Sequence, residues 1–143
     1  MIKTWENPLK TDGFEFVEYA SNKPEQLAEL FIQLGFVAIA KHGSKNVTLY
    51  RQGDINFILN NEAKGQGHEF YSTHGPSANA MAFRVEDANF AVNELKKKGV
   101  EIIPSGAGPM ELQIPAILGI GGSLLYLVDR YKAINIYDID FVP

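Results

Sequence analysis

The sequence predicts an α+β protein made of two successive βαβββ modules, and an internal repeat carries this prediction. An apolar segment, a polar helix cap, an amphipathic helix, a glycine and a second apolar segment occur in this order from residue 20 and again from residue 85. The glycines that end the two predicted helices, Gly35 and Gly99, lie 64 residues apart. A module of this size cannot bury a sheet face alone, whereas two modules side by side share one core.

The domain organisation follows from the length of the chain and the position of the repeats. With 143 residues the chain has the size of one domain, which buries enough surface to fold without disulfides or metals. We therefore expect a single domain over residues 1–143, made of two repeats at about 13–62 and 78–131. Residues 132–143 form a tail or linker, whose alternating apolar and acidic residues predict an extended segment.

The first module is expected to contain a strand, a helix, a second strand and a hairpin. The apolar residues of the predicted helix fall on one face, Pro24 suits its first turn and Gly35 ends it. Asn22 is the expected N-cap, and Gly53 with Asp54 forms the expected hairpin turn. The four elements are predicted at 13–21, 22–35, 36–42 and 46–60.

The second module repeats this order after residues 61–77, which have no periodicity and are predicted to be a loop. Asp87 caps the predicted helix and Gly99 closes it. The glycine-rich residues 119–123 predict a turn and not a phosphate loop, because a strand and not a helix follows them. The elements are predicted at 79–86, 87–99, 100–105, 110–118 and 123–130.

Composition and charge exclude several classes of function. Cysteine is absent, so disulfides, thiolate metal sites and cysteine nucleophiles are excluded. The net charge of −4 gives no basic surface for nucleic acid or an anionic membrane, so we expect neither as a partner. No apolar run reaches the length of about 18 residues that a transmembrane helix needs, and the first residues lack the apolar core of a secretory signal. We therefore expect a cytoplasmic protein.

Four stretches of the chain, 6–21, 44–62, 74–87 and 108–131, carry a resemblance to a known family. The repeat as a whole resembles the vicinal oxygen chelate fold of glyoxalase I, bleomycin-resistance proteins and ring-cleaving dioxygenases. The four stretches resemble the N-terminal domain of bacterial 4-hydroxyphenylpyruvate dioxygenases. The resemblance implies a parent reaction in tyrosine catabolism, in which an Fe(II) oxidoreductase converts 4-hydroxyphenylpyruvate and O2 into homogentisate and CO2.

The end of the chain carries a second implication of the resemblance. In that family a segment similar to residues 136–142 leads into a C-terminal domain of the same fold. The resemblance therefore implies that this absent C-terminal domain is a partner of the chain. Apolar residues of the tail would be exposed without it, which predicts a homo-oligomer. These residues are Ile134, Ile136, Tyr137, Ile139 and Phe141.

The positions at which metal-using relatives of this fold carry ligands predict no metal site in this chain. They correspond here to Glu15 (or Phe14, if the register slips by one), Ala80 and Tyr126. Iron in such dioxygenases needs two histidines and a carboxylate, which these residues do not supply. The resemblance implies that Fe(II) and substrate are held by the C-terminal domain. We therefore assign no catalytic, cofactor-binding or metal-binding residue here and expect the chain alone to be inactive.

The three histidines of the chain do not fall on these ligand positions. His42 lies at the end of a predicted strand, and His68 and His74 lie in the predicted loop at 61–77. We interpret all three as solvated residues without a metal role.

Two other functions remain open. One is a stand-alone, metal-free protein of the bleomycin-resistance type that binds a small molecule in an aromatic cup. The other is a metal-dependent lyase or isomerase of the glyoxalase type, with Glu15 and a loop histidine as ligands, although such a site normally needs three or more protein ligands. The aromatic residues available to line a cup are Phe14, Phe16, Tyr19, Phe57 and Tyr126.

Overall fold

The computed structural model describes residues 4–104 and 112–143, whose strands form one mixed sheet. The order of the strands across the sheet is β6-β7-β5-β1-β4-β3-β2-β8. In chain order the strands are β1 (Thr11–Ala20), β2 (Val37–His42), β3 (Val47–Gln52), β4 (Ile55–Asn60), β5 (Ser77–Val85), β6 (Ala116–Leu118), β7 (Leu124–Val128) and β8 (Phe141–Val142).

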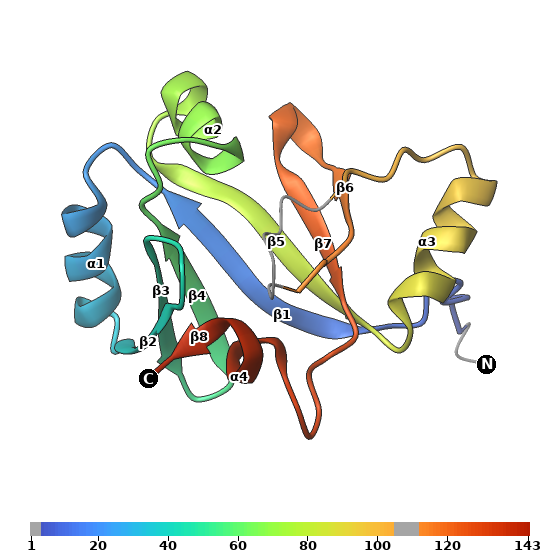
Figure 1. Cartoon of the computed structure of the whole chain (residues 1–143). Coiled ribbons are helices and arrows are strands. Elements are labelled where there is room, and N and C mark those ends of the chain that lie inside the picture. Colours follow the sequence, from blue (N-terminus) through green and yellow to red (C-terminus); the bar gives the residue numbers. More distant parts are fainter. Residues whose placement is uncertain (1–3, 105–111) are drawn as a thin grey trace.

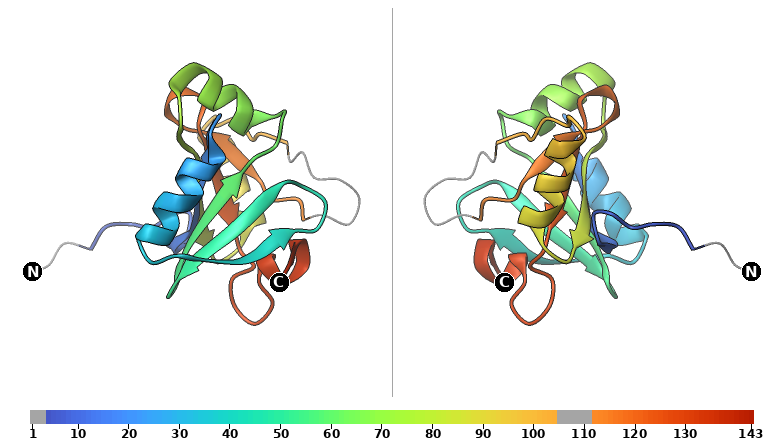
Figure 2. Two further views of the ribbon diagram at one scale, coloured as in Figure 1. Left: turned by 90° about the vertical axis from the view of Figure 1, so that its left-hand side faces the viewer. Right: turned by 90° about the vertical axis from the view of Figure 1, so that its right-hand side faces the viewer.

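Helices cover both faces of this sheet. Figure 1 shows α1 and α3 at opposite sides of the molecule, α2 at the upper end and α4 at the lower end. Figure 2 shows that α4 lies on the opposite side of the sheet from α1. None of the helices in the described ranges is long and apolar enough to span a bilayer. The helices are α1 (Pro24–Gln33), α2 (Gln66–His74), α3 (Ala88–Lys97), the 3₁₀ turn η1 (Ile120–Gly122) and α4 (Ile136–Asp140).

The strand pairing shows why two modules make one sheet. Within each half the first strand pairs in parallel with the last, β1 with β4 and β5 with β7. The two first strands, β1 and β5, then pair antiparallel at the centre of the sheet. The predicted α+β class with two βαβββ modules is therefore confirmed, and the two modules lie side by side.

Each face of the sheet has its own core. Phe31 of α1 packs on Tyr19 and Phe57, with ring centroids 5.1 Å apart in both pairs. On the opposite face Phe16 belongs to a buried cluster that includes Tyr137 of α4. Because side chains alternate along a strand, Phe16 and Tyr19 face different sides.

Short-range signals placed most of the element ends correctly. The Asp87 carboxylate accepts a hydrogen bond from the Phe90 amide at 2.9 Å, as an N-cap does. The hairpin turns at Gly53, whose φ of 55° is a left-handed conformation. Asn22 is not a cap, however, which corrects that prediction: the N-cap of α1 is Lys23, whose amide donates to the Ser21 hydroxyl at 2.9 Å.

The predicted loop at 61–77 is wrong, because it contains the helix α2. This helix begins after Gly65 and has few apolar residues, so it shows no helical periodicity in the sequence. Contacts distant in sequence hold it instead. The Gln66 amide nitrogen donates to the backbone oxygens of Asn79 at 2.8 Å and Gly122 at 3.0 Å.

Two strands of the second module are shorter than predicted. The segment predicted at 100–105 makes a single bridge, between Ile103 and Ala116, and residue 105 lies outside the described residues. The strand predicted at 110–118 is β6 alone, and its first two residues also lie outside them. The turn predicted at 119–123 is present as η1, where Gly121 has a φ of 66°.

The predicted extended tail is wrong, because residues 136–140 form the helix α4. The Asn135 side chain caps this helix, and the Asp138 carboxylate accepts a hydrogen bond from the Asn135 backbone amide at 3.1 Å, which completes a capping box. Ile136 and Tyr137 are therefore buried on the sheet, where we expected exposed apolar side chains. Two residues of strand follow, and Phe141 of β8 pairs with β2.

Candidate binding cavity

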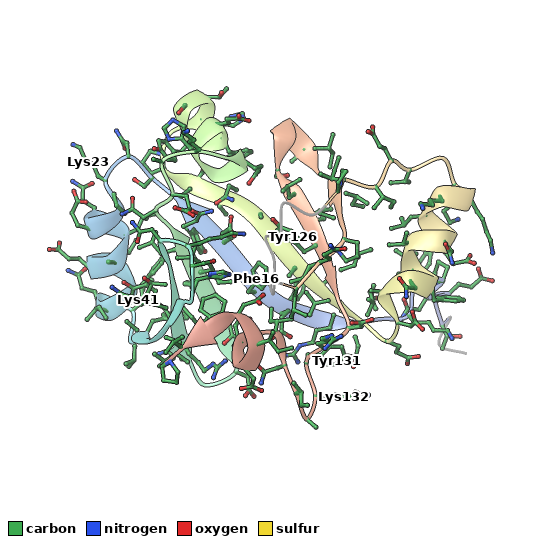
Figure 3. The ribbon with its side chains drawn as sticks, viewed as in Figure 1. Phe16, Lys23, Lys41, Tyr126, Tyr131 and Lys132 are labelled. Carbon is green, nitrogen blue, oxygen red and sulfur yellow. The ribbon has the colours of Figure 1, made fainter. Side chains whose placement is uncertain are left out.

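A cavity of about 520 Å³ lies on the face of the sheet opposite α1 and α3. Its walls are mostly apolar and include Phe16, Ile58, Leu124 and Tyr126 from the three strands β1, β4 and β7, and Ile136 from α4. Figure 3 shows Phe16 and Tyr126 near the middle of the sheet. The size and the apolar lining are those of a small-molecule site.

A β-bulge in β1 decides which residues of this strand face the cavity. Phe14 pairs with Phe83 and Phe16 pairs with Ala82, so Glu15 is an extra residue between them. A bulge turns two consecutive side chains towards the same face. Glu15 and Phe16 are accordingly both buried, and Glu18, two residues beyond Phe16, also lines the cavity.

A second bulge lies in β5, at the equivalent position of the second module. Glu18 pairs with Ala80 and Tyr19 pairs with Ala78, which leaves Asn79 as the extra residue. Asn79 follows Glu15 by 64 residues, the same offset as between the two helix-ending glycines. The structure thus relates Glu15 to Asn79 and Phe16 to Ala80, one residue away from the register expected by counting back from the helix caps.

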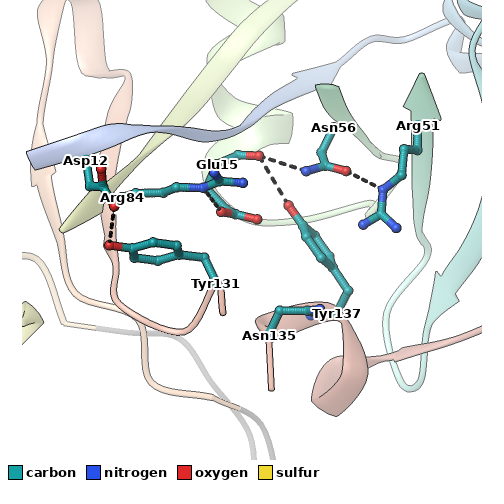
Figure 4. Close-up of polar contacts among 8 residues, drawn as sticks. All are labelled: Asp12, Glu15, Arg51, Asn56, Arg84, Tyr131, Asn135 and Tyr137. Carbon is teal, nitrogen blue, oxygen red and sulfur yellow. Dashed lines mark hydrogen bonds and ion pairs between the residues drawn. The ribbon is translucent and has the colours of Figure 1, made fainter. Parts of the chain in front are cut away.

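The Glu15 carboxylate is closed off by an ion pair. Arg84 donates to it from Nε at 2.5 Å, and the Glu15 side chain is 3% exposed. The hydrogen bond to Glu15 is the main reason that the pKa of Arg84 is raised above its ordinary value. Figure 4 shows Arg84 also near Tyr131, whose hydroxyl donates to Asp12 at 2.9 Å.

The backbone of the bulge is tied to the C-terminal helix. The Glu15 carbonyl accepts from the Asn56 amide at 3.1 Å and from the Tyr137 hydroxyl at 3.4 Å (Figure 4). Asn56 in turn accepts from Arg51 Nε at 2.7 Å. Burial, and then the Glu15 charge, raise the pKa of Tyr137 far above its ordinary value, so its phenol stays a donor.

The Glu18 carboxylate is arranged differently. Its Oε2 accepts from the side-chain amides of Asn79 at 2.5 Å and Asn60 at 3.4 Å. Burial raises the pKa of Glu18, and these two hydrogen bonds and the Lys45 charge offset part of that rise. Oε1 makes no hydrogen bond to the residues that the structure describes, and Glu18 is half-buried because it lines the cavity.

Asn79 is the fully buried residue that holds this carboxylate in place. Its side-chain amide nitrogen donates to Glu18 and also to Gln66 Oε1 at 2.8 Å. Its own Oδ1 has no partner among residues 4–104 and 112–143. The first residue of α2 and the bulge of β5 therefore fix the position of Glu18 together.

The residues present do not fit an iron triad. Glu15 is engaged by Arg84, Ala80 offers a buried methyl group, and Tyr126 offers a phenol. Burial, and then the Glu18 charge, raise the pKa of Tyr126 well above its ordinary value, so this phenol is neutral. Within the described residues, no three histidine, aspartate or glutamate side chains come together in a way that could hold a metal.

The histidines are not all solvated loop residues as expected. His68 and His74 lie on α2, where His68 contacts the Tyr71 hydroxyl at 2.6 Å and His74 Nε2 donates to the Gly121 carbonyl at 2.9 Å. His42 lines the cavity, and its Nδ1 accepts from the Lys45 amide at 3.1 Å.

The aromatic residues expected to line a cup separate into two groups. Phe16 and Tyr126 line the cavity, with ring centroids 5.9 Å apart. Tyr19 and Phe57 pack beneath α1, and Phe14 is 63% exposed on the other face. Sequence reasoning missed Glu18, although its spacing of two from Phe16 is a signal for the same face of a strand.

The fold places the chain among glyoxalase-type α+β proteins. A methylmalonyl-CoA epimerase from Mycobacterium tuberculosis superposes with a TM-score of 0.67 at 18% identity, over 86% of this chain and 91% of that one. At this identity the likeness shows the fold alone.

A narrower match gives the family. The family model described as "Hydroxyphenylpyruvate dioxygenase, HPPD, N-terminal" matches residues 5–142, and the chain belongs to this family. A 4-hydroxyphenylpyruvate dioxygenase of Pseudomonas aeruginosa is 52% identical over 94% of the chain, and "Hemolysin VllY" of Vibrio vulnificus is 57% identical over the same share. The chain spans 39% of the length of each of these relatives.

A solved structure agrees with this assignment. A "xylose isomerase-like TIM barrel/4-hydroxyphenylpyruvate dioxygenase fusion protein" superposes with a TM-score of 0.84 at 39% identity. The match covers 95% of this chain and 22% of that chain.

Proposed function

We propose that this chain is the non-catalytic N-terminal domain of a 4-hydroxyphenylpyruvate dioxygenase and serves packing and assembly. In the whole protein a second, C-terminal domain would hold Fe(II) and convert 4-hydroxyphenylpyruvate and O2 into homogentisate and CO2. The observation that carries the proposal is the Glu15–Arg84 ion pair. Among the three expected ligand positions only Glu15 carries a carboxylate, and Arg84 binds it. The other two positions carry the methyl group of Ala80 and the neutral phenol of Tyr126.

Metal binding at Glu15 would have to break this pair. The carboxylate is almost fully buried, and separating one partner from a buried ion pair costs about 3 kcal/mol or more. Ala80 and a protonated Tyr126 would return little of that cost, because neither is a good ligand for iron.

Exposed apolar side chains near α1 support the assembly role. Five large ones are at least 45% exposed, and single exposed apolar residues are ordinary but a group of them favours association. We propose the C-terminal domain and a second copy of the chain as partners, and the cytoplasm as their location. The five residues are Leu30, Ile32, Leu34, Val37 and Ile55.

A hybrid enzyme tests the proposed function. This chain would replace the matching residues of the Pseudomonas aeruginosa relative, and iron content and turnover of 4-hydroxyphenylpyruvate would be measured. We expect the hybrid to bind iron and turn over substrate, and the chain alone to do neither. Stoichiometric iron in the chain alone that is lost in Glu15→Ala, or turnover by the chain alone, would contradict the proposal.

Light scattering tests the proposed self-association. The average mass should rise with concentration, and Ile32→Glu should lower it because it puts a charge among the exposed apolar residues. Ile120→Glu is the matched control, since Ile120 is 93% exposed on η1, in the second module. The mass of a single chain at every concentration would rule out self-association.

A further inference from the structure

One hydrogen-bond acceptor in the cavity is not used by the protein. Both amide donors that reach Glu18 bind Oε2, and Oε1 makes no hydrogen bond to any residue within 4–104 and 112–143. The lining combines apolar side chains, such as Phe16, Leu124 and Tyr126, with polar ones that include Lys45, Asn60 and Gln66. A carboxylate oxygen in such a place keeps only the water that enters the cavity.

A purely structural role does not account for this carboxylate. Asn79 and Asn60 need one acceptor between them, and the oxygen of a glutamine could also accept from both. A glutamine would also avoid the desolvation that raises the pKa of Glu18. The second oxygen therefore adds a cost to folding that the hydrogen bonds within the protein do not require.

The position of Glu18 is fixed before any ligand arrives. Asn79 is fully buried and holds Oε2, while Gln66 holds Asn79 and is itself bound to two backbone carbonyls. A side chain fixed in this way loses little conformational freedom when a ligand binds, which favours affinity.

We propose that the cavity binds a small molecule with an apolar, flat body and a hydrogen-bond-donating head, which donates to Glu18 Oε1. The body packs against the Phe16 and Tyr126 side chains on the cavity wall, and the head is a hydroxyl or an ammonium group. The volume of about 520 Å³ suits a ligand of this kind. This binding role is separate from the packing role and does not need a metal.

Charges elsewhere on the lining do not select one sign. Lys45, whose charge partly offsets the raised pKa of Glu18, and Lys64 are basic, and Glu62 and Asp140 are acidic. Discrimination between head groups therefore comes from Glu18. At a pH at which Glu18 is ionised, an acceptor head such as a carboxylate would face the Glu18 oxygen without a proton to share, which is unfavourable.

Four probes of one shape test the proposal: 3-phenylpropan-1-ol, 3-phenylpropylamine, methyl 3-phenylpropyl ether and 3-phenylpropanoate. Amide chemical shifts of the whole chain would be followed by NMR during titration. We expect saturable shifts at residues lining the cavity and about tenfold tighter binding of the alcohol and the amine than of the ether and the carboxylate. The alcohol and amine arms show whether the site prefers a neutral or a cationic donor.

The variant Glu18→Gln should reverse this ranking. Asn79 and Asn60 would hold the oxygen of the new amide, so its NH2 group would face the cavity and favour acceptor heads. Glu69→Gln is the matched control, because Glu69 lies on α2 and is not part of the cavity lining, and it should leave the ranking unchanged.

The wild-type ranking alone decides the proposal if Glu18→Gln does not fold. Equal affinities for the four probes, tighter binding of the carboxylate, shifts confined to other parts of the chain, or no saturable shift up to the solubility of the probes would each overturn it. Iron binding or turnover by the chain would contradict only the non-catalytic role, so the two proposals fail separately.

Discussion

Glu15 and Glu18 lie three residues apart on the central strand β1, but their carboxylates have different partners. Glu15 is paired with Arg84, and its backbone carbonyl is bound by Asn56 and Tyr137. Glu18 is bound at one oxygen by neutral amides and leaves the other towards the cavity. A buried carboxylate with a cationic hydrogen-bond partner stabilises the fold, whereas one whose hydrogen bonds come only from neutral amides at one oxygen leaves the other oxygen available to a ligand.

The two carboxylates also sit differently with respect to the bulges. Glu15 is itself the extra residue of the bulge in β1, while Glu18 pairs with Ala80 beside the bulge in β5. The bulge in β1 therefore buries the Glu15 carboxylate near the C-terminal helix, and the bulge in β5 places the amide donor of Asn79 next to Glu18. Glu15 and Asn79, the equivalent extra residues of the two modules, thus share a backbone geometry but differ in chemistry.

Removing Arg84 is the change expected to have the largest effect. Arg84→Met leaves the buried Glu15 charge without a partner and should lower the free energy of unfolding by about 3 kcal/mol, measured by urea denaturation at pH 7. Arg51→Met is the control, because Arg51 donates to the neutral Asn56 side chain, and it should cost about 1 kcal/mol or less. Equal losses in the two variants would show that the Glu15 ion pair is not special.

A smaller loss is expected at the C-terminal helix. Tyr137→Phe removes the hydroxyl that donates to the Glu15 carbonyl, which should cost about 1 kcal/mol because Tyr137 is buried. Tyr131→Phe removes a hydroxyl bound to the exposed Asp12 and should cost less than about 0.5 kcal/mol. The same thermal or urea unfolding measurement checks both variants. A larger loss of stability in Tyr131→Phe would show that the hydrogen bond of Tyr137 to Glu15 is not the main polar contact between the C-terminal residues and the sheet.

The smallest expected effect is a pH dependence at Glu18. Its pKa is raised in the folded protein, so folding favours its protonated form and the contribution of Glu18 to stability falls as pH rises from its ordinary pKa of 4.5 through the folded value. The stability of the wild type relative to Glu18→Gln should therefore decrease over this window. A stability difference that instead grows with pH would mean that the sign is wrong.

Local signals in the sequence predicted much of the fold because they act over a few residues. Pro24 at the start of α1, the Asp87 cap and the turn at Gly53 each depend on their immediate neighbours. The capping box of Asn135 and Asp138 was also present in the sequence, but the alternation of apolar and acidic residues favoured a strand there.

The site could not be predicted to the same extent, because it depends on the two β-bulges. A bulge shifts the register by one residue, and nothing in the residues around Glu15 or Asn79 marks either as the extra one. Counting residues back from the helix caps therefore predicted Glu15 and Ala80 as the residues at the site. In the structure, Phe16 and Glu18 of β1 line the cavity instead of Glu15. The helix α2 was missed for a related reason, since long-range hydrogen bonds of Gln66 and not periodicity hold it in place.

A direct comparison of Glu15→Gln and Glu18→Gln tests the central claim, that one carboxylate holds the fold and the other serves the cavity. Both variants and the wild type would be unfolded with urea at pH 7 in one experiment. Glu15→Gln should lose about 1.5 kcal/mol with its charged hydrogen bond, whereas Glu18→Gln should be as stable as the wild type or more stable. A large loss in Glu18→Gln together with no loss in Glu15→Gln would contradict the claim.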